Sequence, residues 1–293
     1  MSRFDTVSSE TAPLRHVLLR HARLAFVTRP GAGPEWEDLG FTAAPDLDRA
    51  AEEYDAFLSR FEAAGVAVEL LPDAPGLTPD SVYVRDASVV CERGAVLCRM
   101  GKETRAAEPA AHEAAYRALG IPVLGRIEAP GRLEGGDVVW LDPRTVAVGE
   151  GYRTNRDGID QLARLLAGVV DRVIPVPLPH WRGPGDVFHL MSILSPVAED
   201  RALVYSRLLP VPFREELLGR GLSLIEVPDE EFESQGANVL ALAPGRCVAL
   251  GGNPETRRRL EAAGVEVLTY RGTEISAKGL GGPTCLTRPL VRG

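Results

Sequence analysis

The feature that most constrains the fold is a pattern that recurs five times along the chain. Each copy has an amphipathic helical stretch, a glycine, and a short run of strand-forming residues. In the first copy, DLDRAAEEYDAFLSRFEAAG precedes VAVELL, and Tyr54, Phe57, Leu58 and Phe61 fall on one helical face. A glycine that follows a helix often adopts the left-handed conformation that ends it. The five glycines recur every 43 to 55 residues, at Gly65, Gly120, Gly168, Gly221 and Gly264.

Two apolar runs joined by a tight polar turn precede each of the last four helical stretches. DVVWLDPRTVAVG, ILSPVAEDRALVYS and NVLALAPGRCVALG are examples, and such pairs predict strand–turn–strand units. The repeating unit is therefore ββαβ, with about fifty residues per copy. A repeat of this length is typical of propellers and solenoids.

The two ends of the chain favour a closed ring over an open array. GGPTCLTRPLV near the C-terminus and LRHVLLRHARLAFV near the N-terminus each supply one strand that the first unit lacks. Pairing between them would leave no exposed edge strand. We therefore expect an α/β fold, a five-bladed α/β propeller, with residues 1–293 forming one catalytic domain. A Rossmann-like fold is the alternative, because LGGNPETRRRL places a glycine turn before a helix, although the full GxGxxG pattern is absent.

Composition narrows the classes of function. The 293 residues carry a net charge of −8, which disfavours a nucleic-acid partner and suits a cationic small substrate. The start of the chain, MSRFDTVSSETAPLRH, lacks the apolar core of a signal peptide, and no apolar run approaches 18 residues. The four cysteines form no CxxC pair. We therefore expect a reduced cytoplasmic protein with no membrane partner, bound metal or cofactor.

The repeats place chemically active residues at corresponding positions. In a ring of equivalent units, the entrances to the inner strands converge near the axis. Successive entrances carry acids, acids, a histidine, amides and a thiol at intervals of 47 to 52 residues. Each residue alone would also fit a structural role, but packing does not explain their common register. The residues are Asp80 and Asp86, Glu134 and Asp137, His189, Gln235 and Asn238, and Cys285.

This set predicts nucleophilic catalysis. A thiol attacks as the thiolate, and a nearby imidazolium lowers its pKa. A carboxylate behind the histidine fixes the orientation of the ring. We therefore expect Cys285 to be the nucleophile, His189 the acid and base, and Glu134 the orienting group. Asp80 and Asp86 remain as acceptors for a cation such as guanidinium.

Six segments of the chain resemble the guanidino-group-modifying enzymes of the pentein superfamily. This superfamily includes dimethylarginine dimethylaminohydrolases, arginine deiminases and amidinotransferases. The resemblance runs from about residue 80 to the C-terminus and follows the family order. The segments are PDSVYVRDASVV, LEGGDVVW, GEGYRTNRDG, FHLMSILSP, ESQGANVLALAPG and GGPTCLTRPL.

The resemblance implies hydrolysis of arginine or an N-methylated arginine to citrulline, with release of ammonia or a methylamine. Cys285 would form a covalent amidino-thioether while Asp86 binds the guanidinium nitrogens, and His189 would then activate water. Arg153 and Arg105 match arginines that hold the substrate carboxylate in the family. A homodimer is a further possibility.

Two positions depart from the family patterns. Arg85-Asp86 is similar to arginine deiminases, whereas dimethylarginine hydrolases usually have Glu-Asp there. Arginine deiminases usually follow the catalytic histidine with Leu-Asp, but here the run is His189-Leu190-Met191.

The sequence leaves alternatives to this hydrolase function. They are amidino transfer to an amine, an arginine dihydrolase giving ornithine, ammonia and carbon dioxide, or a catalytically silent binding propeller.

Overall fold

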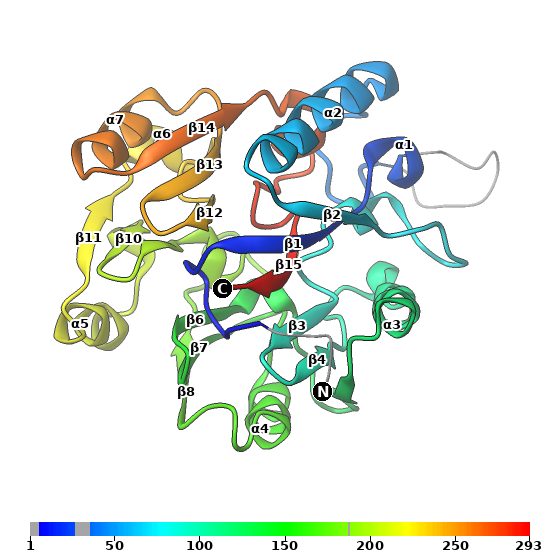
Figure 1. Cartoon of the computed structure of the whole chain (residues 1–293), viewed down its shortest axis with the longest axis horizontal. Coiled ribbons are helices and arrows are strands. Elements are labelled where there is room, and N and C mark those ends of the chain that lie inside the picture. Colours follow the sequence, from blue (N-terminus) through cyan, green and yellow to red (C-terminus); the bar gives the residue numbers. More distant parts are fainter. Residues whose placement is uncertain (1–5, 27–35, 187) are drawn as a thin grey trace.

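A computed structural model describes residues 6–26, 36–186 and 188–293 of the chain. These residues form five three-stranded sheets that follow one another around a central axis (Figure 1). The strands are β1 (Leu14–Leu19), β2 (Ala67–Leu70), β3 (Ser88–Cys91), β4 (Gly94–Leu97), β5 (Val123–Arg126), β6 (Val138–Asp142), β7 (Thr145–Glu150), β8 (Arg172–Pro177), β9 (Leu194–Ala198), β10 (Arg201–Val204), β11 (Ser223–Glu226), β12 (Val239–Ala243), β13 (Arg246–Leu250), β14 (Glu266–Tyr270) and β15 (Arg288–Arg292).

Every sheet has the same internal topology. In four sheets, an antiparallel hairpin is followed by a parallel third strand, in the orders β3-β4-β5, β6-β7-β8, β9-β10-β11 and β12-β13-β14. A parallel pair needs a crossover connection, which a helix supplies in each case. The predicted ββαβ unit is therefore confirmed.

The fifth sheet is built from both ends of the chain. β1 pairs antiparallel with β15 and parallel with β2, so β15 takes the place of the missing hairpin strand. Figure 1 shows β15 beside β1 near the centre of the molecule. This pairing confirms the prediction made from the two terminal segments.

Hydrophobic cores join each sheet to its neighbours. One core joins β1 and β15 with β3 and β4, and a second joins β3 and β4 with β6 and β7. A third continues through β9 and β10 to β12 and β13. A fourth joins β12 and β13 back to β1. The fold is thus a five-bladed α/β propeller rather than an open Rossmann-like sheet.

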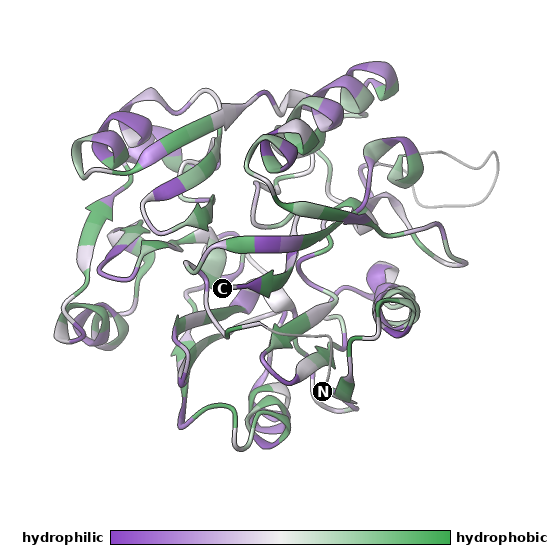
Figure 2. Cartoon of the chain, viewed as in Figure 1, coloured by the Kyte–Doolittle hydropathy of each residue, from purple (hydrophilic) through white to green (hydrophobic). Residues whose placement is uncertain are grey.

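The helices cover the outside of the ring (Figure 1). They end where the sequence predicts, because all five repeat glycines have positive φ angles, between 70° and 81°. Figure 2 shows mixed polar and apolar colouring on the helices and mostly apolar colouring on the strands. The helices are α1 (Ala22–Ala25), α2 (Leu47–Ala63), α3 (Glu108–Leu119), α4 (Arg156–Leu165), α5 (Val211–Gly219), α6 (Asp229–Phe232) and α7 (Pro254–Ala262). Within the described residues, none is long and apolar enough to cross a membrane.

Helix α2 supplies a test of how its apolar face contributes to stability. The Phe57 ring is fully buried and lies 4.6 Å from the Tyr270 ring, centroid to centroid. We expect Phe57→Ala to lower the free energy of unfolding by about 3–5 kcal/mol, because it leaves a cavity between α2 and β14. Leu47→Ala, on the exposed start of the same helix, is the control and should change it by less than about 0.5 kcal/mol. Urea titration followed by circular dichroism measures both, and equal losses would contradict the assignment.

Candidate active site

The predicted site residues come together at one end of the ring axis. Asp86, His189 and Cys285 line one cavity of about 20 Å³, together with Asp80, Arg105 and Arg153. Glu134 lies behind His189 and is fully buried. The strand entrances supply these groups, because Asp86, Glu134, His189 and Cys285 each precede the first strand of a hairpin or β15.

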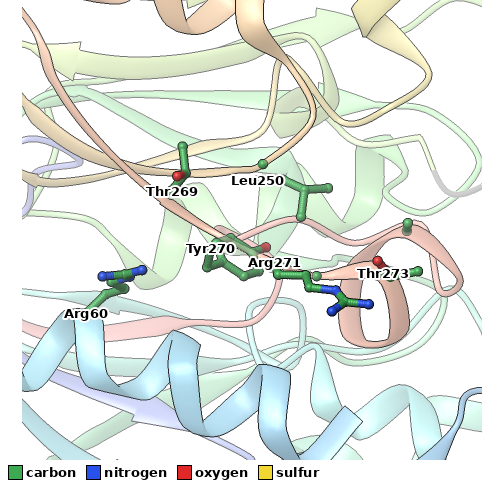
Figure 3. A pocket seen from close by; sticks show the side chains of 9 residues that line it. Arg60, Leu250, Thr269, Tyr270, Arg271 and Thr273 are labelled. Carbon is green, nitrogen blue, oxygen red and sulfur yellow. The ribbon is translucent and has the colours of Figure 1, made fainter. Parts of the chain in front are cut away.

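A larger cavity lies elsewhere and contains none of these groups. It has a volume of about 410 Å³ and is lined by Arg60 of α2, Tyr270 of β14, and the segment that follows β14 (Figure 3). Its lining offers no nucleophile with a paired base. We therefore place the chemistry in the smaller cavity.

Glu134 orients His189. Its Oε2 lies 2.7 Å from Nε2 of His189, and its Oε1 accepts hydrogen bonds from the backbone N–H groups of Gly101 and Lys102 at 2.9 and 3.1 Å. These contacts hold the carboxylate in place from the adjacent sheet. Nε2 of His189 is therefore engaged, which leaves Nδ1 for exchange of a proton with a substrate.

Carboxylates surround His189 and keep it protonated. Burial alone would lower the pKa of His189, but the charges of Asp86 and Asp137 and the hydrogen bond to Glu134 together raise it to about 9. Burial would likewise raise the pKa of Glu134, but the hydrogen bond from His189 and the charge of Arg153 hold it well below its usual range. At neutral pH the two groups form a buried ion pair.

Asp86 lies between the histidine and an arginine. Its Oδ1 accepts a hydrogen bond from the backbone of Gly136 at 3.0 Å and lies 4.0 Å from Nδ1 of His189. Its Oδ2 accepts a 2.6 Å hydrogen bond from Arg105. Arg105 also donates to both carboxylate oxygens of Glu108 and to the carbonyl of Tyr83. Arg105 therefore fixes Asp86, and its contact with a substrate carboxylate stays a prediction.

Cys285 is half-buried and is held by the neighbouring blade. Asn238 Nδ2 lies 3.3 Å from the sulfur, and Asn238 Oδ1 accepts hydrogen bonds from the backbone and hydroxyl of Thr284. Burial, followed by the charge of Asp86, raises the pKa of the Cys285 thiol. The sequence predicts an imidazolium that lowers this pKa, so the structure differs. Asp86 lies close enough to the sulfur to oppose formation of the thiolate.

Two glycines permit this close packing. A β-carbon at Gly136 would lie 2.7 Å from Nδ1 of His189 and 2.8 Å from Oδ1 of Asp86. A β-carbon at Gly282 would lie 2.5 Å from the side chain of Asn238. All three distances are shorter than van der Waals contact. The glycines of LEGGD and GGPTC therefore leave room for the catalytic side chains.

Lys102 and Tyr83 are cavity residues that the sequence reasoning missed. The ammonium group of Lys102 lies 2.5 Å from Oδ2 of Asp80, and Tyr83 donates a hydrogen bond to the carbonyl of Ile275 at 3.1 Å. Tyr83 lies three residues before Asp86, in the motif that supplies both acids. Lys102 follows β4 and carries no recognisable pattern, so only the fold reveals it.

Arg153 lines the cavity beside the Glu134–His189 pair. Its Nη1 lies 3.3 Å from Oε2 of Glu134. Among the described residues, the Nε and Nη2 atoms of Arg153 have no hydrogen-bond partner, so both are available to a ligand. Arg153 can therefore both stabilise Glu134 and bind an anionic group in the cavity.

Asp86, Glu134 and His189 are close enough together to suggest a metal site, with one ligand atom from each within 4.8 Å of the others. Their donor atoms are already engaged, because Glu134 and His189 bind each other and Asp86 binds Arg105 and Gly136. The guanidinium groups of Arg105 and Arg153 also supply the positive charge that a metal would bring. This set fits an acid–base site better than a metal centre.

Comparison with known proteins shows the family of the chain. Residues 44–292 match the family model described as "N,N dimethylarginine dimethylhydrolase, eukaryotic". The chain belongs to this dimethylarginine dimethylhydrolase family.

Three proteins show what this chain is similar to. An uncharacterized Bacillus subtilis protein, YkgA, is 30% identical over 83% of this chain and 81% of its own length. An arginine deiminase of Mycobacterium marinum is 31% identical over 73% of this chain, but the match spans only 61% of that longer enzyme. The structure of a Pseudomonas aeruginosa dimethylarginine dimethylaminohydrolase mutant in complex with citrulline has a TM-score of 0.75 and 26% identity. That match covers 96% of this chain and all of the other.

Arg85 and Met191, the two departures found in the sequence, do not line the cavity of the candidate site. Met191 is buried in the core that joins β6, β9 and β12. Arg85 is also buried, and its Nε donates a 3.0 Å hydrogen bond to the carbonyl of Thr284. Neither side chain would therefore contact a substrate bound in that cavity.

The pKa of His189 is a direct test of the ion pair. We expect its ring to titrate near pH 9 and Glu134→Gln to lower that value by more than one unit, as judged by NMR of labelled histidine. A folded-state pKa above the usual 6.5 contributes stability below about pH 6.5 that is lost as the pH rises through about 9. The free energy of unfolding should therefore fall over this range, and Glu134→Gln should flatten the slope. An unshifted His189 would contradict the ion pair.

The pKa of Cys285 can be read from its alkylation. Cys285 is half-buried, whereas Cys91, Cys98 and Cys247 are buried, so iodoacetamide should label Cys285 first. We expect the midpoint of the pH–rate profile to lie above that of free cysteine. Asp86→Asn should lower the midpoint, because it removes a negative charge near the sulfur. Asp160→Asn on the exposed face of α4 is the control, and equal midpoints for Asp86→Asn and the control would refute the effect.

Proposed function

We propose that this protein hydrolyses the guanidinium group of arginine or an N-methylated arginine, giving citrulline and ammonia or a methylamine. The observation that carries the proposal is a thiol and a carboxylate-bound imidazolium lining one cavity beside Asp86. A nucleophile and an acid on one cavity can act on the same carbon–nitrogen bond.

The charges of the cavity suit a substrate that is cationic at one end and anionic at the other. Asp86 and Asp80 offer carboxylates to the planar donors of a guanidinium group. The free donors of Arg153 suit a carboxylate at the other end of the substrate. Lys102 partly neutralises Asp80. Asp86 is also paired, with Arg105, but its Oδ1 lies 4.0 Å from Nδ1 of His189 on the same cavity as Cys285. This position makes Asp86 our first choice of partner for the guanidinium.

Binding of the substrate would also activate the nucleophile. The charge of Asp86 contributes to the raised pKa of Cys285. A guanidinium paired with Asp86 neutralises that charge and places a cation near the sulfur, so the thiol releases its proton to solvent more readily. Sγ then attacks the guanidinium carbon. Protonated His189 gives the Nδ1 proton to the departing nitrogen as the carbon–nitrogen bond breaks.

The second half of the reaction reverses the role of His189. After loss of the amine, the neutral ring accepts a proton from a water molecule, which attacks the amidino-thioether carbon. The carbon–sulfur bond breaks, the ureido product forms and the thiol is restored. Glu134 stabilises the imidazolium in both halves and does not itself take the proton.

The comparisons support this class of reaction. The related proteins include enzymes named arginine deiminase and a dimethylarginine dimethylaminohydrolase mutant that binds citrulline, a ureido compound. All five sheets contribute to the proposed site, if Asn238 is included with Asp86, Glu134, His189 and Cys285. We therefore propose that residues 1–293 act as a single catalytic unit on a small guanidino substrate.

A citrulline assay tests the proposal. We expect purified protein to form citrulline from arginine or from dimethylarginine, and Cys285→Ser to lower kcat by at least about 1000-fold, because the hydroxyl is a far poorer nucleophile here. Cys247→Ser, a buried cysteine in β13, is the matched control and should retain activity.

The products separate this reaction from its alternatives. Addition of glycine should leave the citrulline yield unchanged, whereas an amidinotransferase would form a new guanidino compound from the amine. Mass spectrometry would also reveal ornithine if the enzyme were a dihydrolase. If no product forms from either substrate, the hydrolase proposal fails.

A further inference from the structure

Arg85 lines a second cavity, which contains none of the candidate catalytic groups. The catalytic groups precede β3, β6 and β15, whereas this cavity is lined by residues within them, including Val90, Trp140 and Leu290. The chain segment around Glu10 forms another wall. The two cavities are therefore separate, and Arg85 lines the one without the candidate catalytic groups.

Three buried arginines line this cavity. Arg85, Arg288 and Arg292 are 1%, 4% and 2% exposed. Each has one guanidinium nitrogen without a hydrogen-bond partner among the described residues: Nη2 of Arg85 and the Nε atoms of Arg288 and Arg292. Their other contacts are largely to backbone carbonyls, namely those of Thr284, Arg85, Ala12 and Ala241.

One carboxylate faces these three cations. Oε2 of Glu10 lies 3.6 Å from Nη1 of Arg85, and the described residues place no other carboxylate in the lining. Burial lowers the pKa of Arg288 and of Arg292 to about 10, with Arg85 contributing in both cases. A buried charge without a counterion is costly. The cavity therefore has two more positive than negative charges among its described residues, together with unused donors.

We propose that Arg85, Arg288 and Arg292 form a binding site for a chloride ion. Guanidinium donors with no acceptor supply the hydrogen bonds, and the excess positive charge supplies the attraction. The cavity volume is about 20 Å³, which holds one species of about the size of a water molecule. A monatomic halide fits that space, whereas phosphate or sulfate, with four oxygens, requires more room. The apolar contacts from Val90, Trp140 and Leu290 also favour a weakly hydrated ion.

The ion would brace the segment that carries the nucleophile. The backbone N–H of Arg85 donates to the carbonyl of Cys285 at 3.1 Å, and Arg288 donates to the carbonyl of Arg85. A chloride bound to these arginines would therefore stabilise the hydrogen bonds that Arg85 makes with Cys285 and with Arg288. This site is separate from the proposed reaction, so chloride binding is testable whether or not the enzyme turns over a guanidino substrate.

Thermal unfolding in chloride-free buffer tests the site. We expect the Tm to rise by about 2–4 °C for each tenfold increase in sodium chloride above the dissociation constant, relative to sodium gluconate at equal ionic strength. Equal Tm values in chloride and gluconate would overturn the proposal, as would occupation of the cavity by water alone.

Paired variants separate the site from a general salt effect. Arg85→Gln removes one donor group and should weaken chloride binding at least about tenfold. Glu10→Gln removes the opposing carboxylate and should strengthen it. Arg144→Gln, from an exposed ion pair with Asp171, should leave the response unchanged. If Arg85→Gln does not fold, the Glu10→Gln response and the anomalous signal of bromide in soaked crystals decide the question. No stronger binding in Glu10→Gln and no bromide between the three arginines would refute the site.

Discussion

The antiparallel pairing of β1 with β15 is the interaction on which the rest of the structure depends. It joins segments from opposite ends of the chain and completes the fifth sheet. The four preceding entrances converge on the axis, but without this pairing the thiol of Cys285 would not be placed against them. Closure also satisfies the strand edges that an open array would expose. The same hydrogen bonds that complete the fold therefore complete the candidate active site.

Buried charge gives the site its reactivity before any substrate binds. Asp86 affects both partners of the reaction, since its carboxylate helps to raise the pKa of the His189 imidazole and that of the Cys285 thiol. In the proposed mechanism, the resting site thus holds a protonated His189 ring and a Cys285 thiol that keeps its proton. A cationic substrate that pairs with Asp86 removes this restraint on the thiol. Such an arrangement limits a reactive thiolate to the time when the guanidinium carbon is present.

Much of this architecture could be predicted from local patterns. The five glycines predict the helix ends because few other residues adopt a positive φ easily. The structure confirms a positive φ at each of the five. The register of Asp86, Glu134, His189 and Cys285 follows from the repeat, since equivalent positions in a ring lie near its axis. The engagement of Arg105 by Asp86 and Glu108 could not be predicted, because it depends on side-chain packing between a loop and α3. Lys102 was missed for the same reason.

The sequence by itself determined the repeat and the closure of the ring by both ends of the chain, and it predicted Cys285 as the nucleophile with His189 as its acid and base. These features depend on local sequence or on the spacing of the repeats, and the same pattern recurs in each repeat. Only the tertiary structure decided the direction of the Cys285 pKa shift and the cavity that Arg85 lines. Both depend on distances between charges that lie far apart in sequence, and electrostatic interactions act through space rather than along the chain.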